Sequence, residues 1–260
     1  GWGKSPDPKV SAIDNANVPF INSLYTKYPS AQLRTDGLNV GLPEGQMGNS
    51  EVGHMNLGAG RIVYQDLAKI NLAVEHKTLN QEPVLVEAFQ YAKDKNVDVH
   101  LLGLVSDGGV HSHTSHLRGL IDATQDFGLQ KVYVHAFTDG RDVDPKSGKQ
   151  YIEDLGNYIS NTSVKLASVV GRYYAMDRDK RWERVKKAYD LVVNGIGTHS
   201  KNAVESIKQS YKNNVTDEFI DPIIMVDDND KPLATIKEND VVIFFNFRTD
   251  RGRELTETLS

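Results

Sequence analysis

The 260-residue sequence predicts an α/β fold with a largely parallel sheet, and two observations support this prediction. From about Asn96 onward, short apolar runs of strand length alternate with segments in which apolar residues recur every three or four positions. That alternation is typical of βαβ units, in which a helix connects two parallel strands. A composition of 39% hydrophobic and 25% charged residues is that of an ordinary globular chain, long enough to bury a core.

The N-terminal quarter differs in composition from the rest. Residues 1–64 are rich in Gly, Asn and Pro, and they contain one convincing helix near Val18–Lys27. Gln65–Ala92 is helical in pattern, and the step at Asn80–Pro83 interrupts it because a residue before proline disfavours helix. We therefore place a domain boundary near residue 65, with 1–64 and 65–260 as the two domains.

The remaining elements follow from the apolar spacing. Four runs are expected to form strands: Val97–Ser106, Lys131–Phe137, Val164–Val170 and Val241–Phe247. Four segments of helical period are expected around them: His116–Phe127, Ser147–Ile159, Lys180–Val193 and Asn202–Lys212. The acidic stretch 226–230 indicates a solvated turn, Arg253–Ser260 has a helical pattern, and His135, inside a predicted strand, is expected to be a satisfied core residue.

Charge, hydropathy and cysteine content exclude several classes. Lys and Arg number 30 against 35 Asp and Glu, so a net charge of −5 gives no general attraction to nucleic acid. No apolar run approaches the ~20 residues of a membrane-spanning helix. The absence of cysteine excludes disulfides and thiolate nucleophiles and fits the cytosol. Gly1–Pro6 has neither an initiator Met nor the apolar core of a signal peptide, so we interpret it as interior sequence.

Charged loops follow the four predicted strands. Because the carboxyl ends of parallel strands lie at one edge, where open α/β folds bind ligands, these loops are expected to share one crevice. Eight of the 11 arginines lie in three of these segments, and the guanidinium fork suits phosphate and carboxylate. We expect a small polyanionic ligand, bound by Arg141, Arg172, Arg178, Arg248 and Arg251. Solvated helix faces are expected for Arg181, Arg184 and Arg253.

The histidines after the first strand allow two interpretations. His111, His113 and His116 have a spacing that could converge on Zn²⁺, with Asp139 or Asp142 completing the site. The interpretation we prefer is that His111 donates to a substrate oxygen or acts as an acid or base, while His116 begins the following helix.

A glycine-rich segment, Gly41–Arg61, contains a candidate nucleophile. Ser50 follows a Gly-Asn turn and precedes a segment capable of helix, where free N–H groups favour an anion. The spacing alone favours a simple N-cap. A nucleophile would also need a base or a metal, and no His–Asp pair in the sequence evidently supplies one.

Five motifs together resemble, in order, those of the cofactor-independent phosphoglycerate mutases. They are Gly48-Asn49-Ser50-Glu51-Val52-Gly53-His54, Ser106-Asp107-Gly108-Gly109-Val110-His111-Ser112-His113, Asp139-Gly140-Arg141-Asp142, the segment from Gly171-Arg172 to Trp182, and Asn246-Phe247-Arg248-Thr249-Asp250-Arg251. The match covers essentially the whole chain. The resemblance implies an N-terminal piece of an alkaline-phosphatase-like domain, 1–64, followed by most of an α/β transferase domain, 65–260.

The resemblance also implies a function. It implies a cytoplasmic, monomeric isomerase of glycolysis and gluconeogenesis that interconverts 3-phosphoglycerate and 2-phosphoglycerate through a phosphoserine intermediate, without bisphosphoglycerate. It implies two Mn²⁺ ions, or Mg²⁺ or Co²⁺, in the complete enzyme, and neither a nucleic-acid nor a membrane partner. Carried over by motif, Ser50 is the nucleophile and a ligand of one Mn²⁺. The substrate-binding residues are then His111, Arg141, Asp142, Arg172, Arg178, Arg248 and Arg251.

Two departures from the family pattern affect this prediction. In the family a metal-binding Asp directly precedes the equivalent of Gly1, and the other metal ligands and a substrate-binding lysine lie beyond the equivalent of Ser260. We therefore expect these 260 residues alone to be catalytically silent, although still able to bind an anion. Two alternatives remain: a non-catalytic phosphoglycerate- or glycerate-binding module, and a metal-dependent hydrolase that uses His111, His113 and Asp139.

Overall fold

The structure is a computed structural model that describes residues 2–3 and 5–260. The chain forms two compact units, Gly1–Val63 and Tyr64–Ser260. The boundary expected near residue 65 lies beside this division. The assignment of the two parts to a phosphatase-like and a transferase domain stays a prediction.

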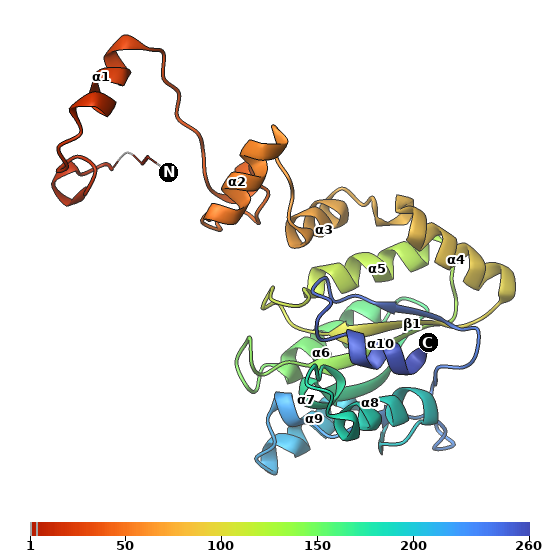
Figure 1. Ribbon diagram of the computed structural model, residues 1–260. Coiled ribbons are helices and arrows are strands. Elements are labelled where there is room, and N and C mark those ends of the chain that lie inside the picture. The colour runs from red at the N-terminus through yellow and green to blue at the C-terminus, as the bar shows by residue number, and fades with distance from the viewer. Residues whose placement is uncertain (1, 4) are drawn as a thin grey trace. The chain divides into compact units, whose positions relative to one another are not determined.

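The N-terminal unit consists of short helices joined by irregular segments (Figure 1). Its elements are η1 (Pro8–Val10), α1 (Pro19–Lys27), η2 (Gly37–Val40) and α2 (Ser50–Ala59). The helix expected near Val18–Lys27 is therefore present, and it begins at Pro19, whose fixed φ suits the first helical position.

This unit buries few apolar side chains. Its hydrophobic cluster consists of Val40, Leu42 and Val52, whereas Phe20, Met47 and other large apolar residues are exposed. So small a core cannot offset much of the chain entropy lost on folding. Apolar surface of this kind is typical of a segment that packs against further protein.

The C-terminal unit is built on a six-stranded sheet with the order β4-β5-β3-β2-β1-β6 (Figure 1). The four predicted strands are present and parallel, as β1 (Val99–Leu104), β2 (Val132–Thr138), β3 (Val164–Gly171) and β6 (Val241–Phe244). Two further strands, β4 (Thr198–Ser200) and β5 (Ile223–Met225), extend the sheet, and β5 runs antiparallel to β3. The expected α/β fold with a largely parallel sheet is confirmed.

Helices connect these strands as the apolar spacing predicts. The four expected helices are α5 (Thr114–Asp126), α6 (Gly148–Ile159), α8 (Trp182–Asn194) and α9 (Ala203–Lys212). The helical stretch after residue 65 divides, as expected, into α3 (Asp66–Glu75), η3 (Leu79–Gln81) and α4 (Pro83–Lys95). Short elements complete the unit, namely α7 (Arg172–Ala175), η4 (Asp217–Phe219) and α10 (Arg253–Leu259).

The core lies on both faces of the sheet. Leu101 belongs to a cluster with residues of α4, α5 and α6, whereas its neighbour Leu102 belongs to a second cluster with residues of α8 and α10. Successive strand residues point to opposite faces, so a strand buried on both sides is apolar throughout. Among the described residues, no helix is both long and apolar enough to cross a membrane.

Candidate active site

The four parallel strands β3, β2, β1 and β6 are neighbours, so the loops that follow them meet at one edge of the sheet. The backbone N–H of Arg248, after β6, donates to the carbonyl oxygen of His111, after β1, at 3.3 Å. Gly171, at the end of β3, passes close to η4, where a Cβ would lie 2.4 Å from the carbonyl oxygen of Glu218. Only glycine therefore allows this strand to place the next residue in the site.

Arg172 is the buried centre of this edge. Its side chain is 3% exposed, and its Nη1 lies 2.6 Å from Oδ1 of Asp139 and 2.5 Å from Oδ2 of Asp142. Burial opposes the charge, but the two carboxylates outweigh burial and raise the pKa of Arg172. Arg172 is therefore a charged, fixed part of the site.

Asp139 is buried with Arg172 and organises the loop after β2. It accepts hydrogen bonds from the Ser106 hydroxyl at 2.7 Å and from the backbone N–H groups of Arg141 and Asp142 at 3.2 and 3.0 Å. Burial raises its pKa, but these donors and Arg172 outweigh burial, so the pKa lies below its usual value. Asp139 is thus an ionised anchor for the loop that carries Arg141 and Asp142.

His111 lies between two carboxylates. Its Nε2 is 3.6 Å from Oδ2 of Asp142, and its Nδ1 is 4.0 Å from Oδ1 of Asp250. Burial and the positive charge of Arg172 lower the pKa of His111 to about 4, so its imidazole is neutral at pH 7. Its Nδ1 is buried and has no hydrogen-bond partner among the described residues.

The remaining arginines lie on the open side of the cluster. Arg178 and Arg248 both contact Asp250, at 2.8 and 3.1 Å. Arg251 donates from Nη1 to the carbonyl oxygen of Met176 at 3.2 Å, and its pKa is lowered by burial and by the charges of Arg178, Arg172 and Arg141. The charges felt by Arg251 come from Arg178, Arg172 and Arg141, and Asp250 links the fifth arginine, Arg248, to Arg178.

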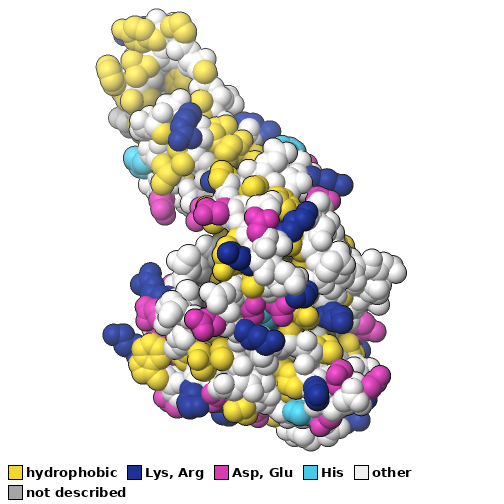
Figure 2. Space-filling model, turned by 90° about the vertical axis from the view of Figure 1, so that its right-hand side faces the viewer, with side chains coloured by type: hydrophobic (Ala, Val, Ile, Leu, Met, Phe, Trp, Pro, Cys, Tyr) yellow, Lys and Arg dark blue, Asp and Glu magenta, His cyan; other side chains and the backbone are white. Residues whose placement is uncertain are grey.

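Arg141 is the most exposed of these arginines. Its side chain is 56% exposed and lies 3.7 Å from Oε1 of Glu218. On the face of the molecule in Figure 2, basic and acidic side chains are interspersed rather than separated. The C-terminal unit thus combines a buried Arg–Asp frame with arginines that can still turn toward a ligand.

Ser50 belongs to the N-terminal unit and is the first residue of α2. The N-cap of this helix is Asn49, whose side chain accepts from the N–H of Val52 at 3.0 Å, so the expectation that Ser50 is the cap is wrong. Gly48 makes the turn possible, because a Cβ there would lie 1.9 Å from the carbonyl oxygen of Thr35. The Ser50 hydroxyl is exposed and is not needed for capping.

No base in the described part of the N-terminal unit activates Ser50. His54 Nδ1 lies 3.1 Å from its Oγ but only 2.7 Å from its carbonyl oxygen. A carbonyl oxygen can only accept, so this nitrogen carries the proton and donates to the carbonyl. His54 Nδ1 cannot then take a proton from Ser50, and a metal ion would be needed to ionise the hydroxyl.

Among the described residues, the three residues of the hydrolase alternative do not form a group whose possible metal-ligand atoms converge. His113 is the N-cap of α5, with Nδ1 accepting from the N–H of Ser115 at 3.1 Å. Asp139 is saturated by the donors described above. His116 lies in the first turn of α5, as expected, and pairs with Asn71 at 2.7 Å.

A different group could offer metal ligands in the described chain, formed by Asp98, His100 and Asp240 near the amino ends of β1 and β6. Both ring nitrogens of His100 already have partners, since Nε2 lies 3.2 Å from Asp240 and Nδ1 lies 2.9 Å from His135. His135 in turn bonds Ser168 at 2.8 Å, which confirms it as a satisfied core residue. A buried hydrogen-bonded chain explains this group without an ion.

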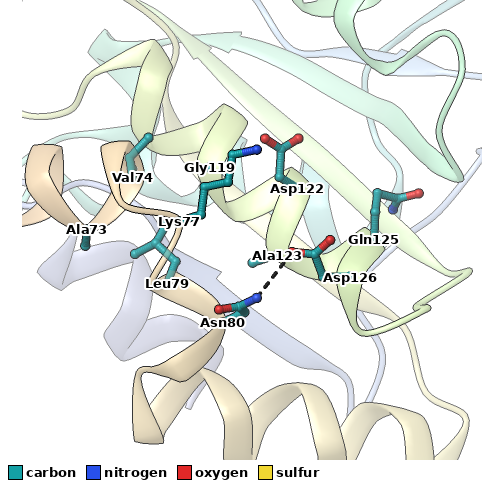
Figure 3. Close-up of a pocket in the computed structure, with 10 residues that line it drawn as sticks. All are labelled: Ala73, Val74, Lys77, Leu79, Asn80, Gly119, Asp122, Ala123, Gln125 and Asp126. Atoms are coloured by element: carbon teal, nitrogen blue, oxygen red, sulfur yellow. Dashed lines mark hydrogen bonds between the residues drawn. The ribbon is translucent and has the colours of Figure 1, made fainter.

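A cavity of about 240 Å³ lies elsewhere in the C-terminal unit, between the α3–η3 segment and α5 (Figure 3). Its polar lining includes Lys77, Asn80 and Asp126, and Asn80 donates to Asp126 at 3.3 Å. None of the site residues expected from the sequence lines it.

The C-terminal unit is a doubly wound α/β unit, and a buried Arg–Asp frame with open arginines at its carboxyl edge has the chemistry that suits phosphate or carboxylate groups. Residues 70–260 match the family described as BPG-independent PGAM N-terminus, and the chain belongs to that family.

Relatives across the whole chain agree with this family. The sequence is 81% identical over 260 residues to the 2,3-bisphosphoglycerate-independent phosphoglycerate mutase of Flavobacterium johnsoniae, and 79% identical to that of Flavobacterium psychrophilum. Each match covers 100% of this chain and 52% of the relative. A Leishmania mexicana phosphoglycerate mutase, whose crystal structures were determined at low cobalt concentration, superimposes with a TM-score of 0.75 and 33% identity over 94% of this chain and 46% of its own. The chain thus spans about half the length of these relatives, and the resemblance to this family is confirmed.

Sequence reasoning gave too little weight to the carboxylates of the site. It considered Asp139 only as a metal ligand, whereas the structure shows it bound to Arg172. It assigned no role to Asp250, which contacts two arginines. The available signal was an acidic residue within three positions of an arginine in each of the three loops that carry arginine, because a crowded positive site needs counter-charges.

Proposed function

We propose that this chain supplies the phosphoryl-accepting serine and the substrate-binding arginines of a phosphoglycerate mutase that works without bisphosphoglycerate. The observation that carries the proposal is the arginine cluster on its buried Arg172–Asp139–Asp142 frame. Family membership and relatives of the same name support the assignment of the ligand as 3-phosphoglycerate or 2-phosphoglycerate.

In the proposed reaction, the Ser50 hydroxyl gives up its proton, its oxygen attacks phosphorus, and the bond from phosphorus to the C3 oxygen of 3-phosphoglycerate breaks. The released C3 oxygen takes up a proton, which leaves glycerate and a phosphoserine. The C2 hydroxyl of the same glycerate then loses its proton and attacks phosphorus, the bond from phosphorus to the Ser50 oxygen breaks, and that oxygen takes up a proton. No net group enters or leaves, so the overall reaction is an isomerisation.

The arginine cluster serves both halves of this reaction. Arg172, Arg178, Arg248 and Arg251 can bind the phosphate and carboxylate charges, which keeps the glycerate in place between the two transfers. Holding both reactants converts a bimolecular step into an effectively unimolecular one. His111 and Asp142, side by side beneath the cluster, are placed to exchange hydrogen bonds with the glycerate hydroxyls.

The resemblance implies a pair of Mn²⁺, Mg²⁺ or Co²⁺ ions near Ser50. The Ser50 oxygen suits such an ion, because His54 leaves it without a base, and the ion would stabilise the serine alkoxide and the phosphoryl oxygens. The one group of three candidate ligands in the described chain, around His100, does not include Ser50. We therefore propose that the other ligands lie outside these 260 residues and that the 260 residues alone are inactive.

A coupled assay for conversion of 3-phosphoglycerate to 2-phosphoglycerate, with Mn²⁺ and no bisphosphoglycerate, tests the proposal on the full-length natural protein that contains this sequence. Activity is expected there and not in the 260-residue chain. Binding of 3-phosphoglycerate without turnover in the full-length protein would instead favour a binding module. We also propose a monomer located in the cytoplasm, which sedimentation and cell fractionation test.

A further inference from the structure

Asp250 joins two half-exposed arginines that lie on different segments. Its Oδ2 accepts from Nη1 of Arg178 at 2.8 Å and from Nη2 of Arg248 at 3.3 Å. Its Oδ1 lies 3.1 Å from Nε of Arg248. Arg178 follows α7 and Arg248 follows β6, so one carboxylate fixes guanidinium groups from two sides of the site.

Neither arginine has another polar side-chain partner in the described part of the chain. Arg178 and Arg248 are about half exposed, and every ion pair that they form is with Asp250. Two guanidinium groups this close repel each other unless a negative charge lies between them. Without Asp250 or a bound anion, both side chains would be free to move into solvent.

The backbone around Asp250 is itself held firmly against the Arg178 loop. Arg251 donates to the carbonyl oxygen of Met176, and Glu254 accepts from the N–H of Lys180 at 2.9 Å. Glu254 is buried, and Lys180 has a positive φ of 58° that this contact supports. Asp250 therefore belongs to a fixed segment, and its carboxylate can hold the side chains of Arg178 and Arg248, which packing does not fix.

The second oxygen of Asp250 faces His111. Oδ1 of Asp250 and Nδ1 of His111 are both buried and lie 4.0 Å apart. Neither atom takes part in a hydrogen bond within the described chain, and Oδ1 has only its ion pair with Arg248. A shift of about 1 Å would bring them to hydrogen-bond distance. In that bond Nδ1 would carry the proton, because a carboxylate only accepts, and Nε2 would keep a lone pair that can accept from a ligand hydroxyl.

We propose that Asp250 is the positioning residue of the anion site, whose carboxylate holds Arg178 and Arg248 together before a ligand arrives and orients the ring of His111. This inference rests on the proposed function, because it concerns the same site. A site held in place before binding loses less side-chain entropy when the ligand binds. Asp250 acts through its neighbours and is not itself required to touch the substrate.

The test compares Asp250→Asn with a matched control, Asp179→Asn. Asp179 lies in the same Arg178 loop and pairs with Arg181 at 3.6 Å, but it is 59% exposed and outside the cluster. Calorimetric titration of the full-length natural protein that contains this sequence, kept free of divalent metal to prevent turnover, is expected to show affinity for 3-phosphoglycerate about five- to tenfold lower for Asp250→Asn, from two half-exposed ion pairs. Asp179→Asn is expected to leave the affinity unchanged, and Asp250→Glu to recover part of it.

Two further measurements separate positioning from a merely structural effect. In an Arg178→Ala background, Asp250→Asn is expected to lower affinity only about twofold to threefold, because one of the two arginines through which Asp250 acts is gone. NMR titration of the His111 ring is expected to show a lower midpoint in Asp250→Asn, since Asp142, Arg172 and Arg248, which also face the ring, are unchanged.

Unchanged or tighter binding by Asp250→Asn would overturn the inference, and tighter binding would make Asp250 a competitor of the ligand. The inference would also be overturned if the losses of binding free energy caused by Asp250→Asn and Arg178→Ala were fully additive in the double variant. If the wild-type protein binds no 3-phosphoglycerate, the proposed function loses its support, and the His111 titration then decides the role of Asp250 alone.

Discussion

Replacing Arg172 by alanine should destabilise the C-terminal unit strongly. Arg172 is 3% exposed and neutralises Asp139, which is 1% exposed, so its loss leaves a buried carboxylate without its cation. Removing one partner of a buried ion pair typically costs about 3–5 kcal/mol. Asp139 keeps its hydrogen bonds from Ser106 and two backbone N–H groups, so we expect about 3 kcal/mol, the lower end of that range.

Urea unfolding followed by circular dichroism measures this loss as a change in the free energy of unfolding. Arg141→Ala is the matched control, because its side chain is 56% exposed and its ion pair spans 3.7 Å, and less than about 1 kcal/mol is expected. The pKa of Asp139 is lowered in the folded protein, so the stabilisation by Arg172 is present above about pH 4 and is lost as the pH falls through the folded pKa. A loss below about 1 kcal/mol for Arg172→Ala at pH 7 would refute the reasoning.

Three further outcomes are expected. Burial lowers the pKa of His116 to about 4, so protonation of this ring favours the unfolded state. The free energy of unfolding in urea should therefore be highest above about pH 6.5 and fall by up to about 3 kcal/mol toward pH 4. An identical pH profile in His116→Gln would contradict this. In the full-length protein, Ser50→Ala should abolish mutase turnover while leaving the circular dichroism spectrum unchanged, because Asn49 caps the helix; residual turnover would exclude Ser50 as the phosphoryl carrier. Arg248→Ala should weaken 3-phosphoglycerate binding in calorimetry by about 1.5–3 kcal/mol, and unchanged affinity would remove Arg248 from the site.

The sequence predicted those strands and helices in which the apolar residues form long runs or recur at a regular spacing. The runs at Val97–Ser106 and Val164–Val170 are long and apolar because their strands are buried on both faces. The strands Thr198–Ser200 and Ile223–Met225 were missed, since three residues are too few to establish an alternation. The antiparallel pairing of the second of these with β3 depends on long-range packing that no local pattern records.

The sequence also predicted that the arginines meet at one edge of the sheet. It did not predict which carboxylate each arginine contacts. Parallel strands bring their carboxyl ends together whatever the loops contain, so the positions of Arg172 and Arg248 followed from topology. Which carboxylate binds which guanidinium depends on side-chain directions in irregular loops. The Ser50 cap was mispredicted for a related reason, because Asn49 and Ser50 are both good caps and backbone geometry alone decides between them.

The place of β6 in the sheet has a consequence for the order of folding. This strand pairs with β1, and Val241 lies opposite Val99, although the two are 142 positions apart in the chain (241 − 99). During synthesis, β1 and β2 can pair long before β6 has emerged, and closing so long a loop is slow. The segment that carries Arg248 and Arg251 arrives with that last strand, so the arginine cluster becomes complete only when the whole sheet has formed.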